Sequence, residues 1–228
     1  MIYSTKGIVV NYIKYKETSI IVRIYTKSFG LRSYIVNSVR SKKSKGKMAL
    51  YQPLTILDLV VYENNSKSLQ RISEAKCFYP YKEIPFEIRK TSIALFIAEL
   101  LSKTLRHSED PDELTYQFIE SSLIHFDSMG SHIGHFHLQF MLRLTTFLGF
   151  RPYDIDELLG QIEDLTSYSA EDLRLFDELN HSPYDSSLSL TIPQRNTFLK
   201  AIINYYQLHE EHIGGFKSLP VLKEVFHT

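Results

Sequence analysis

The chain has 228 residues, of which 43% are hydrophobic and 13% aromatic, so it can bury a core and wholesale disorder is excluded. This length allows one large domain or two small ones. No apolar run reaches the 18 residues of a membrane span, and residues 1–6 do not resemble a signal peptide. We therefore expect a reducing, cytoplasmic location without a membrane partner.

The single cysteine, Cys77, excludes an intramolecular disulfide and a cysteine-based zinc site. Its position beside Phe78 in an apolar, strand-like stretch predicts a buried small residue and not a nucleophile.

Charge is unevenly distributed, although the formal net charge is zero. Residues 1–90 contain 17 of the 26 Lys and Arg but only 6 of the 26 Asp and Glu, a net charge of +11. The other residues therefore carry −11. This asymmetry predicts a polyanion-facing first part, and it is also consistent with two domains that attract each other.

The first third of the chain predicts five short strands, because β-branched and aromatic residues alternate there with a period of two. The expected strands cover residues 7–13, 19–25, 31–36, 54–62 and 70–78. In the third strand, Arg32, Tyr34 and Val36 share one face. Five strands with one long loop are typical of an OB-fold barrel, and an SH3-like barrel would satisfy the same pattern.

After residue 85 the hydrophobic period becomes helical. We expect helices over 86–105, after an Asp110 N-cap, over 135–148 up to Gly149, after Ser169, from Thr191 to the glycines 214–215, and after Ser218. The helix over 135–148 is apolar on almost all sides and should be central. The sequence thus predicts an α+β, multidomain chain. Residues 1–80 form a five-stranded OB-fold β-barrel that binds nucleic acid, and residues 81–228 form an all-α helical bundle.

A basic run over residues 40–47 is the main candidate binding feature. Lys and Arg neutralise phosphates whatever the base sequence, although a solvated loop without a partner is the alternative interpretation. Neighbouring strands and turns contribute further cations. The predicted nucleic-acid-binding residues are Lys14, Lys16, Arg23, Lys27, Arg32, Arg40, Lys42, Lys43, Lys45 and Lys47.

Tyrosines are interleaved with these cations and offer rings on which bases could stack. They are Tyr12, Tyr15, Tyr25, Tyr34 and Tyr51. For most of them, ordinary β propensity is the favoured interpretation.

Other chemistry is weakly represented. The histidines at 132, 135 and 137, and those at 209 and 212, lack the spacing of a metal site, so core or interface positions are favoured. Motifs of phosphate-binding loops, nucleophile elbows and zinc proteases are missing. Acidic pairs at expected helix starts are explained by capping. We therefore expect no metal, no cofactor and no enzymatic activity.

Short motifs lie in order along both parts of the chain: Lys6-Gly7-Ile-Val-Val, Lys16-Glu17-Thr-Ser-Ile-Ile21, Tyr25-Thr26, Gly30-Leu-Arg32, a basic loop with Ser44, Pro53 before a strand, Phe140-Met-Leu-Arg143 and Leu148-Gly149-Phe-Arg-Pro152. In this order they resemble the RecO family of bacterial DNA repair proteins. Many relatives carry a four-cysteine zinc motif after that proline, whereas residues 153–168 here contain no cysteine. The acidic residues of 154–164 suggest a short helix instead.

The resemblance implies a recombination mediator and not an enzyme. Such a protein binds single- and double-stranded DNA, anneals complementary strands, and acts with RecR to load recombinase on strands coated by single-strand-binding protein. It implies a nucleoid-associated bacterial protein, monomeric when alone. Two alternatives stay open: an RNA-binding or translation-linked barrel, and a protein adaptor that uses a barrel edge or a groove among its helices.

Overall fold

The computed structural model describes residues 1–40, 46–64, 67–106, 108–162, 168–211 and 213–227. The chain divides into two compact units. Unit 1 comprises Met1–Tyr81 and Leu101–Ile124, and unit 2 comprises Lys82–Leu100 and His125–Thr228. The division into domains 1–80 and 81–228 stays a prediction.

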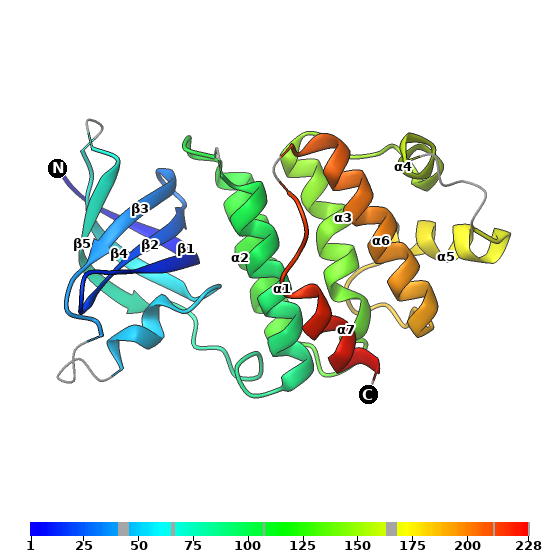
Figure 1. Cartoon of the computed structure of the whole chain (residues 1–228), viewed down its shortest axis with the longest axis horizontal. Helices are drawn as coiled ribbons and strands as arrows, with labels where there is room; N and C mark the ends of the chain where they lie inside the picture. The colour runs from blue at the N-terminus through cyan, green and yellow to red at the C-terminus, as the bar shows by residue number, and fades with distance from the viewer. Residues whose placement is uncertain (41–45, 65–66, 107, 163–167, 212, 228) are drawn as a thin grey trace. The chain divides into compact units, whose positions relative to one another are not determined.

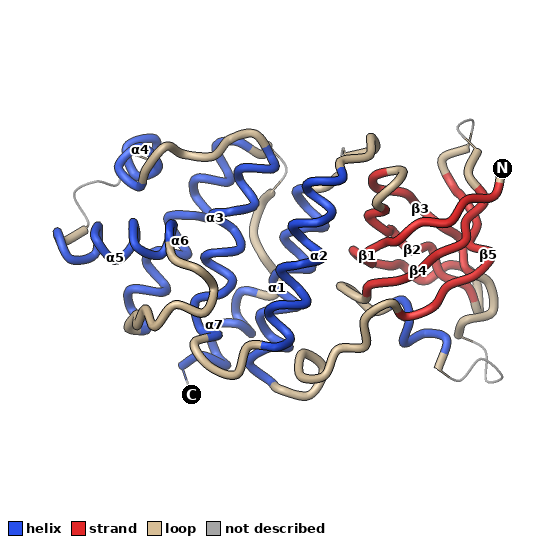
Figure 2. The backbone as a smooth tube through the Cα atoms, turned by 180° about the vertical axis from the view of Figure 1, so that it is seen from behind, coloured by secondary structure: helices blue, strands red, loops and turns tan. Residues whose placement is uncertain are grey.

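A closed five-stranded barrel forms most of unit 1 (Figures 1 and 2). Its strands are β1 (Ile2–Tyr15), β2 (Ser19–Thr26), β3 (Gly30–Val36), β4 (Ile56–Tyr62) and β5 (Leu69–Cys77). They lie in the order β1-β2-β3-β5-β4, with β3 and β5 parallel and the other pairs antiparallel. The five predicted strands and the OB-fold barrel are confirmed.

The first strand is longer than expected because it pairs with two neighbours. Its beginning pairs with β4 and its end pairs with β2. Within the β1–β2 pairing the register shifts between Val9 and Asn11, as at a β-bulge. The sequence pattern predicted a strand only over residues 7–13, which pair with β2.

Buried side chains fill the barrel, among them Val9, Ile20, Val22, Ile24, Tyr34, Leu57, Leu59 and Val61. On β3, Tyr34 belongs to this cluster and Val36 packs against it, which confirms the predicted alternation. Tyr25 and Tyr51 are also buried. These three tyrosines therefore have a structural role and not a base-stacking one, because a buried ring cannot stack on a base.

A 3-10 helix, η1 (Lys47–Tyr51), follows the basic run and was not predicted. Met48, Leu50 and Tyr51 pack with the barrel cluster. The apolar residues that follow the basic run are thus part of the barrel core. Of the run itself, residues 41–45 lie outside the described residues.

The segment 101–124 lies against β2 and β3 within unit 1. The Leu31 amide donates to the Ser108 carbonyl at 2.7 Å, and the Tyr25 hydroxyl donates to the Asp112 carbonyl at 3.4 Å. Gly30 makes this approach possible. Its φ is +66°, and a Cβ there would lie 2.5 Å from the carbonyl oxygens of Ser108 and Asp110.

In the described part of the chain, seven α-helices follow the barrel. They are α1 (Ile88–Thr104), α2 (Glu113–Ser128), α3 (Phe136–Leu148), α4 (Ile155–Gln161), α5 (Ala170–His181), α6 (Ile192–His209) and α7 (Leu219–His227). In unit 2, α3 lies beside α6 (Figure 1), and nine of its thirteen residues are buried, as predicted for a central helix. Among the described residues, no helix is long and apolar enough to span a membrane.

Local capping signals account for several helix ends. Ser169 and Thr191 each form a capping box, and Gly149 ends α3 with a φ of 84°. Asp154 caps α4, the short helix expected where relatives carry cysteines.

Two predicted helix ends were wrong. Asp112, and not Asp110, caps α2, because its carboxylate accepts from the amides of Leu114 and Thr115. The helix α6 ends at His209, before the glycines at 214 and 215 that were expected to end it.

A buried carboxylate organises the start of unit 2. Asp127 is fully buried, and it accepts hydrogen bonds from the amides of Lys82, Glu83 and Ile84 at 2.8 to 2.9 Å. The buried Lys90 ammonium donates to the Asp127 carbonyl at 2.8 Å and pairs with Glu83. These contacts hold residues 82–84 against the end of α2.

We predict that Gly30→Ala destabilises the protein by about 2–4 kcal/mol, because it adds left-handed backbone strain and a clash with backbone that cannot rotate away. Denaturant unfolding measures the change. Gly130→Ala is the matched control, since nothing lies within 4 Å of a Cβ there. Equal effects of the two substitutions would contradict the close approach at Gly30.

Candidate nucleic-acid interface

One group of predicted binding residues gathers at the β1–β2 turn. Lys14 and Lys16 lie at this turn and are exposed. The Arg40 guanidinium donates to the carbonyls of Lys16 and Ser19 at 3.3 and 3.5 Å, and the Arg40 amide donates to the Thr18 carbonyl. The basic run therefore begins at this turn. Its first side chain supports the turn as well as adding charge.

The remaining residues of the run are only partly described. Lys47 is exposed at the start of η1. Lys42, Lys43 and Lys45 lie outside the described residues, so their role in binding stays a prediction.

Two other predicted cations have partners inside unit 1. The Lys27 ammonium lies 3.0 Å from the Glu113 carboxylate and lowers the pKa of that carboxyl. Arg32 donates to the Glu109 carbonyl at 2.7 Å and lies 3.7 Å from the buried Glu63 carboxylate. A phosphate bound by Lys27 or Arg32 would compete with these partners for the cation.

Arg23 lies on the outer face of β2, beside a residue that the sequence did not suggest. Its Nη2 donates to the Arg106 carbonyl at 3.5 Å. Burial, and then repulsion by Arg106, lower the pKa of Arg23, while Glu109 raises it. Both side chains line a cavity of about 430 Å³ together with Arg32, Lys67, Glu63 and Glu109.

A second cavity of about 510 Å³ continues from the first along β5. The two cavities share Glu63, Lys67 and Gln70, and the second adds Arg71 and Tyr62, a residue that is 46% exposed. We call the surface lined by these two cavities the β3–β5 groove. It provides cations for phosphate and one exposed ring, which are the two elements of single-strand binding sites.

Gln70 shapes the rim of this groove. Its side chain is buried and donates to the carbonyls of Asn64 and Lys67, at 2.8 and 2.6 Å, while it accepts from the Asn64 amide. These bonds hold Asn64 and Lys67 in the connection between β4 and β5. In OB folds this connection borders the binding face, a signal that could have identified Lys67 from the sequence. Arg106 had no such signal.

The exposure of Cys77 corrects another sequence prediction. The thiol was expected to be buried but is exposed at the end of β5. Most residues of this strand are exposed or partly exposed, so its apolar composition near residue 77 was misleading.

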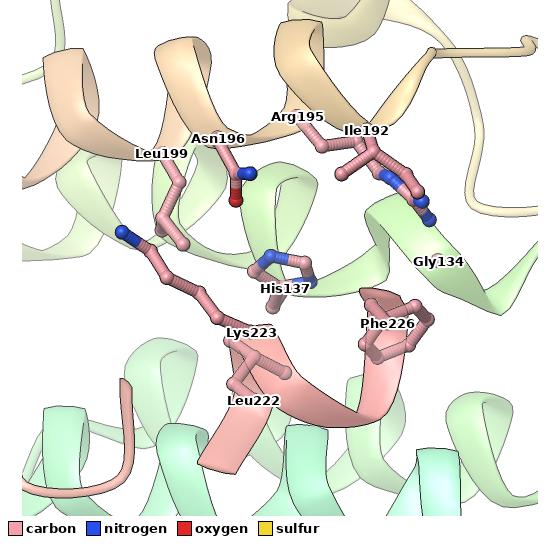
Figure 3. Close-up of a pocket in the computed structure, with 9 residues that line it drawn as sticks. All are labelled: Gly134, His137, Ile192, Arg195, Asn196, Leu199, Leu222, Lys223 and Phe226. Carbon is pink, nitrogen blue, oxygen red and sulfur yellow. The ribbon is translucent and has the colours of Figure 1, made fainter. Parts of the chain in front are cut away.

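Two histidines at the start of α3 are buried, each with 4% of its surface exposed. Burial, His132 and Arg195 lower the pKa of His135 to about 4. Burial, Arg195 and His135 lower the pKa of His137 to about 3. Figure 3 shows the His137 ring among side chains of α6 and α7. The interpretation as core histidines is confirmed for this pair.

The other histidines considered for metal binding differ from this pair. His209 is exposed and stacks on Phe150, with ring centroids 4.9 Å apart, and His212 lies outside the described residues. Within the part of the chain that the structure describes, no three His, Cys, Asp or Glu side chains are arranged to hold a metal ion.

A closed OB-fold barrel with a basic groove is typical of barrels that bind nucleic acids. The family model described as "Recombination protein O N terminal" matches residues 1–81, and "Recombination protein O C terminal" matches residues 85–154. The chain therefore belongs to the RecO family of DNA repair proteins, which confirms the resemblance seen in the sequence.

Curated relatives support this assignment over nearly the whole chain. The chain is 37% identical over 235 residues to the DNA repair protein RecO of Flavobacterium psychrophilum, covering 97% of this chain and 98% of the relative. It is 33% identical over 241 residues to that of Phocaeicola vulgatus and 34% identical over 244 residues to that of Bacteroides fragilis. Each alignment covers 99% of this chain and 100% of the relative.

We predict that the buried histidines make the protein acid-sensitive. Because their folded-state pKa values lie below the unfolded value of about 6.5, the unfolded state binds protons first as the pH falls. The free energy of unfolding is highest above about pH 6.5 and declines toward pH 4. Between pH 7 and pH 5 the loss is about 1–2 kcal/mol for each histidine.

Denaturant unfolding at pH 7 and pH 5 measures this loss. His137→Leu should reduce the pH dependence of the free energy of unfolding. A pH dependence identical in wild type and His137→Leu would show that His137 does not titrate with unfolding.

Proposed function

We propose that this protein is a recombination mediator that binds single- and double-stranded DNA and promotes annealing of complementary strands. The observation that carries the proposal is the basic β3–β5 groove on an OB-fold barrel, in a chain that belongs to the RecO family of DNA repair proteins. The β1–β2 turn and the basic run extend the positive charge at another part of the barrel.

The chemistry of these surfaces suits the DNA backbone more than the bases. Lys and Arg side chains neutralise phosphates and release counterions, and they carry no sequence information. Neutralised backbones repel each other less, while base edges remain free to pair. This physical route leads from backbone binding to annealing without a catalytic group, and the protein acts as a non-enzymatic mediator.

Partner proteins complete this proposal. Acting with RecR, the protein helps to load recombinase on strands coated by single-strand-binding protein, in the bacterial cytoplasm at the nucleoid. It is monomeric when alone. Unit 2 contains 10 Lys and Arg against 17 Asp and Glu, a net charge of −7, so most of it is unsuited to phosphate and better suited to holding proteins.

A strand-annealing assay tests the proposal directly. We expect the protein to accelerate pairing of two complementary DNA strands, both bare and coated with single-strand-binding protein, and to bind DNA better than RNA of the same length. Preference for RNA would support an RNA-binding barrel instead. No salt-dependent binding to either nucleic acid would support a protein adaptor.

A charge-matched pair of variants tests the basic run. In the first, Lys42, Lys43, Lys45 and Lys47 become Ala, while Arg40 is kept because it supports the β1–β2 turn. We expect weaker binding to all sequences. The log–log salt slope should become shallower by up to about 0.9 per lost contact for duplex DNA and about 0.7 for single strands.

The control variant removes the same number of positive charges from exposed positions of unit 2: Arg151, Arg174, Lys200 and Lys217 become Ala. Its salt slope should match that of the wild type. If both variants change the slope equally, net charge and not local contact explains the effect, and the run is not part of the interface.

A further inference from the structure

Two guanidinium groups are brought together at one end of the β3–β5 groove. Arg23 projects from β2 and Arg106 from the turn after α1, and a hydrogen bond from the Arg23 guanidinium to the Arg106 carbonyl joins these residues, which are 83 positions apart in the sequence. Among the described residues, neither side chain forms an ion pair with a carboxylate within 4 Å. Two neighbouring cations of this kind repel each other, and an anion bound between them would relieve that repulsion.

The cavity around this pair has an excess of positive charge. Its charged lining residues are Arg23, Arg32, Lys67, Arg106, Glu63 and Glu109, four cations against two carboxylates. The Glu63 carboxylate already accepts from the Tyr34 hydroxyl at 2.7 Å and lies near Arg32. It therefore neutralises Arg32. The charges of Arg23, Arg106 and Lys67 then face the single carboxylate of Glu109, which leaves a net charge of +2 for a ligand.

We propose that the cavity between Arg23 and Arg106 is a subsite that binds one phosphate group of a DNA strand. This inference rests on the proposed DNA binding and deepens it, because it assigns a fixed contact to a residue outside the predicted set. Planar guanidinium groups bind phosphate oxygens in a bidentate manner, which an ammonium cannot do. The volume of about 430 Å³ leaves room for the sugar attached to the phosphate.

The phosphate can come from two places in a strand. An internal phosphodiester carries one negative charge, whereas a terminal phosphomonoester carries −1.5 to −2 near pH 7. The experiment separates these sources with 3′-labelled oligothymidylates of one length, which have either a 5′-hydroxyl or a 5′-phosphate. Affinities are measured for the wild type, Arg106→Gln, Arg106→Lys and the control Arg151→Gln.

Arg106 is the appropriate position because its side chain is exposed and the bond from Arg23 goes to its backbone carbonyl, so the variants should fold. We expect Arg106→Gln to weaken binding roughly tenfold, the effect of losing a charge-assisted contact. Arg106→Lys should recover only part of this loss, although it keeps the charge. Arg151→Gln should bind like the wild type.

Each outcome has a defined meaning. If Arg106→Gln loses affinity equally for both oligonucleotides, the subsite binds an internal phosphate. If the loss of affinity is confined to the 5′-phosphorylated strand, the subsite binds a terminal phosphate. Wild-type affinity of Arg106→Gln for both strands, or full recovery by Arg106→Lys, would overturn the subsite while leaving DNA binding intact. A wild type that binds neither strand would overturn both proposals.

Discussion

The close backbone contact between β3 and the segment 101–124 is the constraint on which the arrangement of unit 1 depends. The bond from the Leu31 amide to the Ser108 carbonyl forms only where Gly30 has no side chain. The same contact decides which cations are available. It brings Glu109 to Arg32 and places Arg106 beside Arg23. One glycine thereby links the packing of this unit to the composition of its basic groove.

The internal partners of the predicted binding residues differ in strength. The Lys27–Glu113 pair is exposed, with 40% and 59% of the side chains accessible, and exposed pairs of this kind add little stability. A DNA phosphate can therefore replace Glu113 at little cost. Arg32 is held by the Glu63 side chain, which is only 5% exposed, and removing one partner of a buried pair is costly. Lys27 is thus suited to exchange partners, whereas Arg32 supports the end of the barrel.

Local interactions explain why so much of the fold could be predicted. Alternation defined the strands, and the capping boxes at Ser169 and Thr191 act within one turn of helix. Where two local signals competed, the prediction was less reliable. Asp110 and Asp112 both precede α2, and only the path of the chain makes Asp112 the cap. Cys77 showed the same limit, because composition alone does not determine exposure.

The sequence by itself determined the barrel, the helical part and the excess of cations, since periodicity and charge are properties of neighbouring residues. Its resemblance to the RecO family was likewise carried by short local motifs. Only the tertiary structure decided which cations meet. Arg106 joins Arg23 through a contact between distant segments, and Arg32 and Lys67 line the same cavity. Such contacts depend on how strands and helices pack, and packing leaves no periodic signal at a single arginine or lysine.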